Sequence, residues 1–97
     1  MVEHIVLIKL AKSVSQEQKE ELISKTCKLK DLIPGIIDLQ QGINFSPRSQ
    51  GYEIGLTVRF ENQEALENYL PHPDHQEILA YLKEIGLEDL LVVDFTI

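Results

Sequence analysis

Residues 69–76, Tyr-Leu-Pro-His-Pro-Asp-His-Gln, hold two of the three histidines of this 97-residue chain and one of its three tyrosines. A neutral histidine can take a proton from a carbon atom beside a carbonyl group. A tyrosine hydroxyl can then donate a hydrogen bond to the oxyanion that forms. Tyr69 and His75 therefore have the side chains needed for proton transfer to and from a carbonyl compound.

The same stretch also has the residues of an ordinary helix start. Pro73 fits the first helical position, and either His72 or Asp74 can serve as the N-cap. Tyr69 falls at an inward position of the helical segment before it, where a tyrosine can simply be packed. The residue types alone leave both interpretations open, a reactive site and a helix cap.

His75 falls in the first turn of the second expected helix, near the positive end of the helix dipole. That position disfavours the imidazolium, so we expect a lowered pKa and a neutral ring near pH 7. His4, His72 and His75 have no defined spacing of metal ligands, so we expect no metal site.

His4 and Asp94 lie near opposite ends of the chain, on the first and last expected strands. Asp94 is surrounded by apolar residues, where an unpaired carboxylate is costly. Both residues lie on even positions. If the two strands are antiparallel neighbours, the residues can therefore meet on one face, with His75 close by. His4 can equally be a buried strand histidine, and Asp94 an acceptor of backbone or histidine hydrogen bonds.

The elements that would position these residues follow from hydrophobic periodicity and helix caps. Residues 2–10 are apolar on both faces, as in a central strand, and Ser15 with Gln18 has the pattern of a capping box. Ile37, Leu39, Ile43 and Phe45 share one face of a second strand. We expect helices over 15–33, 62–70 and 74–85, and strands over 2–10, 36–45, 52–60 and 89–97, with a candidate bulge at Gly42.

This order predicts a single domain over residues 1–97. It is an α+β fold of the ferredoxin-like β-α-β-β-α-β type, with a four-stranded antiparallel sheet and the helices on one face. The first and last strands are apolar on both faces, so the face without helices needs a cover. A second copy of the chain is the simplest one. We therefore expect a homodimer with an enclosed space between each sheet and its helices.

The formal net charge of −7 disfavours nucleic acids and anionic membranes as partners. No stretch approaches transmembrane length, and the N-terminus lacks the pattern of a signal peptide. The single cysteine, Cys27, excludes a disulfide within the chain and fits a cytoplasmic location. Its place in a helical apolar pattern predicts a core or half-buried side chain.

Four segments together resemble the stress-responsive A/B barrel domain (Dabb) family: EHIVLIKL, IPGI, GYEIGLTVRFENQEALENYLPHPDHQ and LLVVDFT. The resemblance covers essentially the whole chain and implies a dimeric α+β barrel. One branch of the family resembles polyketide cyclases of the olivetolic acid cyclase type. Those enzymes close a linear polyketide by intramolecular aldol condensation, without a cofactor.

The cyclase branch implies roles for several residues here. His75 matches the general base and Tyr69 the group that stabilises the enolate, while His4 and Asp94 match further residues of the site. His72 matches the first histidine of the motif and is expected to contact the ligand.

One position departs from the cyclase pattern. The cyclase has a histidine on the third strand, two residues after a Gly-Tyr pair, where this chain has Ile54. We therefore expect Ile54 and Leu56 to give the ligand-binding pocket an apolar wall.

Two functions remain in consideration. The first is a small dimeric stress-responsive barrel protein of unassigned activity that binds a small hydrophobic ligand in the barrel. The second is a cofactor-free polyketide cyclase-like lyase. An enzyme should have an open cavity lined by Tyr69, His75 and Asp94, whereas a structural protein should fill that space with Ile54, Leu56 and Phe60. No flavin, haem or nucleotide-binding pattern is present, so no cofactor is expected.

Overall fold

The computed structural model describes all residues, 1–97, and contains one four-stranded sheet and four helices. The sheet has the strand order β2-β3-β1-β4, and every neighbouring pair is antiparallel. This confirms the predicted ferredoxin-like fold. The elements are β1 (Val2–Leu10), α1 (Gln16–Cys27), α2 (Leu29–Leu32), β2 (Ile36–Ile43), β3 (Tyr52–Phe60), α3 (Gln63–Tyr69), α4 (Pro73–Ile85) and β4 (Leu87–Thr96).

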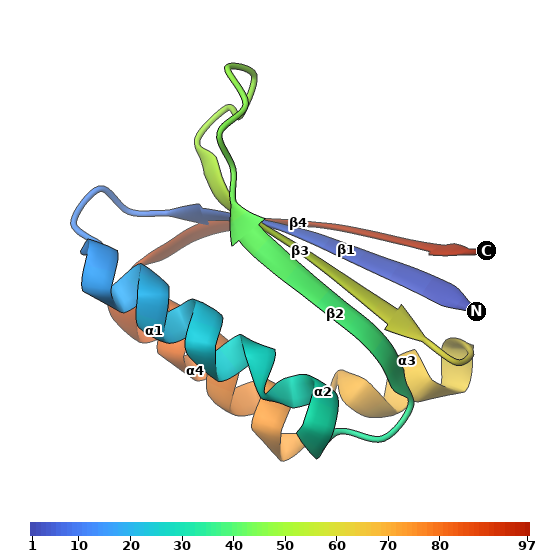
Figure 1. Ribbon diagram of the computed structural model, residues 1–97. Helices are drawn as coiled ribbons and strands as arrows, with labels where there is room; N and C mark the ends of the chain where they lie inside the picture. The colour runs from blue at the N-terminus through green and yellow to red at the C-terminus, as the bar shows by residue number, and fades with distance from the viewer.

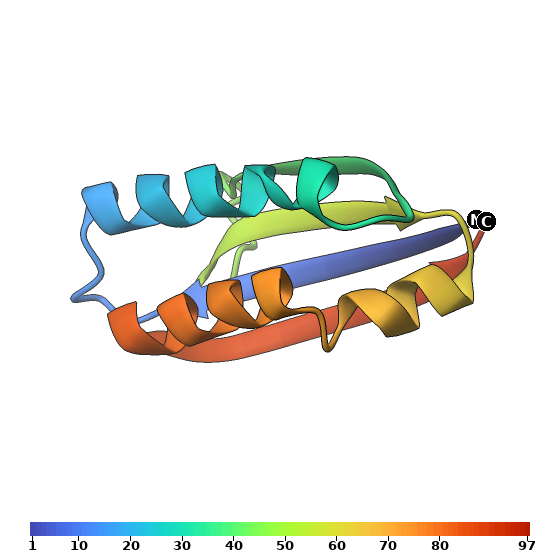
Figure 2. The same ribbon diagram turned by 90° about the horizontal axis from the view of Figure 1, so that it is seen from below.

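The helices all lie against one face of the sheet, and no element covers the other face (Figure 1). Seen from the helical side, α1 runs along β2 and β3, while α4 runs along β4 (Figure 2). None of the helices is long and apolar enough to cross a lipid bilayer.

The core lies between the sheet and the helices. Even-numbered residues of β1 point toward the helices and are buried, whereas the odd-numbered ones are only partly buried. The same alternation in β3 buries Ile54, Leu56, Val58 and Phe60. Leu22, Leu66 and Leu82 pack onto this surface from three helices. The period of two along each strand therefore separates the core face from the uncovered face.

Helix starts agree with the sequence pattern. The Ser15 hydroxyl accepts a hydrogen bond from the Gln18 backbone, and the Gln18 side chain accepts one from the Ser15 backbone. The Asn62 side chain caps α3, and Pro73 occupies the first turn of α4.

The helix expected over residues 15–33 is divided into two at Lys28. The Lys28 amide donates to the Lys25 carbonyl, which tightens the last turn of α1. One turn earlier, the Thr26 hydroxyl donates to the Leu22 carbonyl at 2.8 Å, a contact that bends helices. Thr26 takes the buried position, so the prediction of a core or half-buried Cys27 was wrong, and that side chain is exposed.

The second strand also differs from expectation. The register shift lies between Ile36 and Asp38, whereas Gly42 pairs regularly with Gly55. Ile37 falls within this shift and is exposed, so it does not share the inward face of β2. The strand ends at Ile43, and Phe45 lies in the loop beyond it, 95% exposed.

Gly35 connects α2 to β2 in a conformation that L residues rarely adopt, with φ +90°. A Cβ there would lie 2.7 Å from the Cβ of Ala65. We expect Gly35→Ala to lower the free energy of unfolding by about 2 to 3 kcal/mol, from backbone strain plus overpacking. Urea denaturation measures this.

Gly42→Ala is the matched control, because a Cβ at Gly42 would meet nothing within 4 Å and its φ is ordinary. We expect a change within about 0.5 kcal/mol there. Equal effects of the two substitutions would contradict this account of the α2–β2 turn.

Candidate functional site

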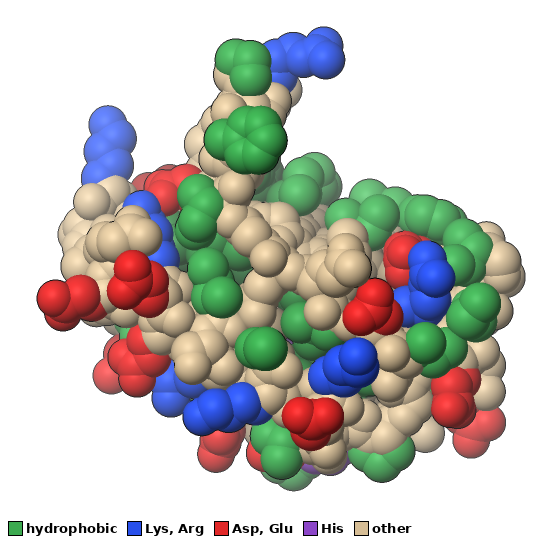
Figure 3. Space-filling model, in the orientation of Figure 1, with side chains coloured by type: hydrophobic (Ala, Val, Ile, Leu, Met, Phe, Trp, Pro, Cys, Tyr) green, Lys and Arg blue, Asp and Glu red, His purple; other side chains and the backbone are tan.

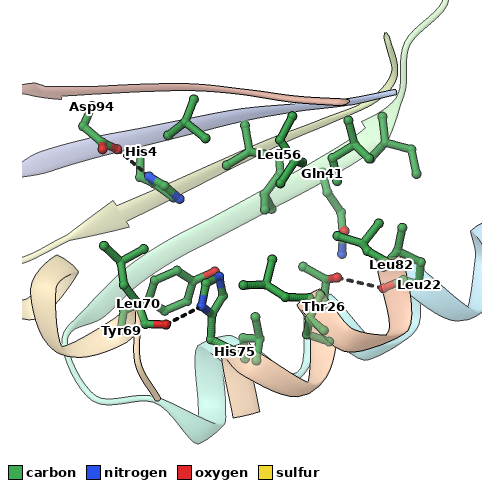
Figure 4. Close-up of a pocket in the computed structure, with 18 residues that line it drawn as sticks. His4, Leu22, Thr26, Gln41, Leu56, Tyr69, Leu70, His75, Leu82 and Asp94 are labelled. Atoms are coloured by element: carbon green, nitrogen blue, oxygen red, sulfur yellow. Dashed lines mark hydrogen bonds and ion pairs between the residues drawn. The ribbon is translucent and has the colours of Figure 1, made fainter. Parts of the chain in front are cut away.

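A cavity of about 270 Å³ lies between the sheet and the helices (Figure 4). Of its 18 lining residues, 13 are hydrophobic, so a ligand inside would be largely removed from water. The polar side chains on its wall are His4, Thr26, Gln41, His75 and Asp94, and Tyr69 adds a hydroxyl. No Lys or Arg lines the cavity, which favours a neutral ligand.

The pairing of β1 with β4 brings His4 and Asp94 together. They are direct partners across the two strands, and His4 Nδ1 contacts Asp94 Oδ1. His4 is buried, whereas the Asp94 side chain is 41% exposed because β4 is an edge strand. Since the carboxylate can only accept, Nδ1 of His4 carries the proton, and His4 is the partner that the sequence suggested for this carboxylate.

Tyr69 and His75 reach the same end of the cavity from the helices. The Tyr69 ring centroid lies 4.2 Å from that of His75 and 5.9 Å from that of His4. Phe60 packs against the other side of Tyr69 at 5.0 Å. The fold therefore gathers His4, Tyr69, His75 and Asp94, which are far apart in the sequence, around one end of one cavity (Figure 4).

The proton of His75 is placed by the backbone. Its Nδ1 lies 2.9 Å from the carbonyl oxygen of Leu70, which can only accept, so Nδ1 donates. In the neutral ring, Nε2 then holds the lone pair. The same carbonyl accepts a second hydrogen bond from Gln76 Nε2 at 2.7 Å.

Burial is the main reason why the pKa of His75 lies below 6.5. Repulsion from His4 and His72 lowers this pKa further, while the hydrogen bond to Leu70 opposes the shift. The direction agrees with the sequence-based expectation, but desolvation rather than the helix dipole is its largest cause. The ring is therefore neutral at pH 7 and available as a base.

Burial acts in the opposite sense on Tyr69 and raises its pKa to about 12. The phenol is thus protonated at neutral pH and can donate a hydrogen bond. The hydroxyl makes no hydrogen bond within the chain, and no side-chain polar atom without a partner is fully enclosed, so this oxygen borders accessible space.

His72 does not line the cavity. Its Nδ1 accepts a hydrogen bond from the Asp74 backbone at 3.1 Å and so caps α4. This geometry favours the helix-cap interpretation of His72, and its contact with a ligand stays a prediction. His72 also does not combine with His4 and His75, since no group of three or more metal-ligating side chains is placed to hold an ion.

Ile54 and Leu56 both lie on the cavity wall, yet the space stays open beside them. Thr26 and Gln41 also lie on the wall, and neither was predicted there from the sequence. Gln41 had a signal, because its amide interrupts the inward apolar positions Leu39 and Ile43 of the second strand.

We expect His75 to titrate below 6.5 in the folded protein, followed by NMR of the imidazole ring. In the unfolded chain its pKa returns to about 6.5. The unfolded chain then binds the proton more readily, so lowering the pH from neutral toward the folded-state pKa lowers the free energy of unfolding. His75→Gln should remove this part of the pH dependence, and a midpoint at or above 6.5 would refute the assignment.

Known proteins are similar in sequence to this chain over nearly its full length. Residues 2–97 match the model of the stress responsive A/B barrel domain. The chain is 28% identical over 97 residues to olivetolic acid cyclase from Cannabis sativa, covering 98% of this chain and 95% of the relative. It is 32% identical over 96 residues to the stress-response A/B barrel domain-containing protein HS1 from Arabidopsis thaliana, covering 97% and 87%.

A solved structure is also similar to this chain in its fold. A dimeric ferredoxin-like protein of unknown function from Thermobifida fusca is 25% identical and superposes with a TM-score of 0.86, over 99% of this chain and 90% of the other. From the match over residues 2–97, this chain belongs to the stress responsive A/B barrel domain family.

Proposed function

We propose that the cavity binds a small, mainly apolar carbonyl compound and that the protein acts on it as a cofactor-free, polyketide cyclase-like lyase. The observation that carries this proposal is the hydrogen bond from His75 Nδ1 to the Leu70 carbonyl. It leaves the lone pair of Nε2 free, in a ring that burial keeps neutral, beside a protonated Tyr69. This is the pairing of base and oxyanion donor that enolate formation requires.

In the proposed reaction, His75 Nε2 takes a proton from the carbon beside a carbonyl group. The electron pair moves into the carbonyl, and the Tyr69 hydroxyl donates to the enolate oxygen. The enolate carbon attacks a second carbonyl of the same molecule and forms the ring-closing C–C bond. The resulting alkoxide takes the proton back from His75, which restores the neutral base.

The surroundings support this chemistry. An apolar wall excludes water, which strengthens hydrogen bonds to a developing charge. His4, fixed by Asp94, adds a polar group at the same end of the cavity. The similarity to olivetolic acid cyclase extends over nearly the whole chain.

One observation favours a second candidate, a stress-responsive protein that binds a hydrophobic ligand without converting it. Ile54 is buried on the cavity wall, where the cyclases that the chain resembles have a histidine. This side chain adds apolar contact area but no proton donor or acceptor.

Exchange of the protons beside a ketone in D₂O separates the two candidates. We expect the protein to accelerate this exchange in 4-phenylbutan-2-one at neutral pD, followed by NMR. His75→Gln should lower the protein-dependent rate at least about 100-fold, because general base catalysis contributes that much. Tyr69→Phe should lower it by a similar factor through the lost hydrogen bond to the enolate.

His72→Gln is the matched control, because His72 caps α4 outside the cavity, and its exchange rate should stay near that of the original protein. If the ketone binds but exchanges no faster than in buffer, the protein is a binding protein and the lyase proposal is wrong.

We also propose that the protein is a homodimer joined through the uncovered face of the sheet. Leu91, Val93 and Phe95 are between 44% and 49% exposed, and Ile5 and Leu7 lie beside them on β1. Figure 3 shows hydrophobic side chains gathered along this side of the sheet. Exposed apolar patches of this kind mark association surfaces, and the similar protein from Thermobifida fusca is dimeric.

Val93 pairs with Ile5 in the middle of this face. We expect Val93→Asp to yield a monomer in analytical ultracentrifugation at micromolar concentration, because a carboxylate buried between two sheets is costly. Leu32→Asp is the control, since Leu32 is equally apolar and 53% exposed but lies on α2. A dimer that survives Val93→Asp would rule out this face.

A further inference from the structure

Gln41 and Thr26 are the polar side chains of the cavity wall that the proposed reaction does not use. Gln41 comes from β2, at the opposite end of the cavity from His4 and Asp94 (Figure 4). The sheet register explains this separation. Gln41 pairs with Leu56 on β3, and Leu56 pairs with Val6 on β1. Val6 is the next inward residue of β1 after His4. That places Gln41 about 7 Å along the strands and about 10 Å across them from His4.

The orientation of the Gln41 amide follows from its one partner. Nε2 donates to the backbone carbonyl of Ile23 on α1 at 2.7 Å, so the nitrogen is on that side. Oε1 accepts no hydrogen bond from the chain, and it is not fully enclosed. The amide therefore has a free acceptor, and one N–H remains beyond the hydrogen bond to Ile23.

An amide that faces an apolar cavity wall costs free energy unless it has a hydrogen-bond partner. On the cavity side, the wall around Gln41 is apolar. Its other side borders a surface hollow that Ser24 and Lys28 also line. The other polar group nearby, the Thr26 hydroxyl, already donates to the Leu22 carbonyl at 2.8 Å. Gln41 thus has hydrogen-bonding capacity that its protein neighbours do not fill.

We propose that Gln41 is a specificity residue, which recognises a neutral hydroxyl group at the end of the ligand remote from His75. A hydroxyl can donate to Oε1 and accept from the free N–H, whereas a plain alkyl end would leave both groups unpaired. A hydroxyl is favoured over a carboxylate, because no Lys or Arg lines the cavity. The ligand class is therefore an elongated molecule with a polar head, an apolar middle and a hydroxyl-bearing tail. This inference rests on the proposed function only in requiring that the cavity binds a ligand.

Two phenols that differ by one hydroxyl test the proposal, 4-butylphenol and 4-(4-hydroxybutyl)phenol. Their affinities are measured by calorimetry at pH 7 for the original protein, Gln41→Met and Gln40→Met. Methionine keeps the length of the side chain but removes the amide. Gln40 is the control, because its side chain is exposed and belongs to the strand position next to Gln41, on the other face.

We expect the preference for the hydroxybutyl over the butyl compound to fall about fivefold in Gln41→Met, as one hydrogen bond to a neutral partner predicts. In Gln40→Met the preference should be unchanged. The side-chain amide signal of Gln41 in the original protein should shift with the hydroxybutyl compound and not with the butyl compound. That NMR measurement decides the matter if Gln41→Met does not fold.

Three outcomes would overturn the proposal. The first is an equal preference in the original protein and Gln41→Met, and the second is an amide signal that ignores the hydroxyl. Either would mean that Gln41 only ties β2 to α1 and is hydrated, while ligand binding in the cavity still stands. The third is that neither phenol binds, which removes this inference together with the proposed ligand class.

Discussion

The pairing of β1 with both of its neighbours is the constraint on which the site depends. Four inward residues of β1 each have a direct partner on β3 and another on β4, so one register sets three strands at once: Val2, His4, Val6 and Ile8. A slip of one residue would turn His4 outward and leave Asp94 without its partner. The apolar alternation that buries Val6 and Ile8 fixes this register, so the core and the site are specified by the same pattern.

Burial shifts the pKa values of two neighbouring side chains in the cavity in opposite directions. It lowers the pKa of His75 and raises that of Tyr69, so that both are neutral at pH 7. A neutral base and a neutral donor can lie in contact without the repulsion or desolvation cost of charged groups. The backbone carbonyl of Leu70 completes the arrangement by fixing the proton on Nδ1 of His75. The connection between α3 and α4 is thus part of the chemistry as well as of the fold.

The sequence predicted this architecture well where local patterns determine it. Period-two alternation, the capping box at Ser15 and the proline at position 73 were sufficient to place the strands and most helix starts. The pairing of His4 with Asp94 followed from parity and strand order. The candidate site was harder, because a cap and a reactive group can use the same residue types. His72 was assigned to the ligand by resemblance, whereas its imidazole caps a helix.

The remaining errors concern positions that the hydrophobic pattern alone does not distinguish. Within α1, Thr26 takes the buried position and its hydroxyl donates to the Leu22 carbonyl one turn back, which leaves Cys27 exposed, although both positions suit a helical apolar pattern. The bulge near Asp38 lies beside the turn at Gly35, not at the glycine within the strand. The parity of the second strand placed Gln41 on the inward face, but its partner, the Ile23 carbonyl of α1, follows only from the fold.

The two faces of the sheet are linked through the strands that they share. His4 on β1 and Asp94 on β4 face the cavity. The adjacent pair, Ile5 and Val93, faces the uncovered side of the sheet. β4 is an edge strand, so one side of its backbone has no partner within the sheet. A second sheet packed on Ile5 and Val93 would hold β4 in place and with it the carboxylate that orients His4. In this arrangement, association on one face contributes directly to the geometry of the site on the other.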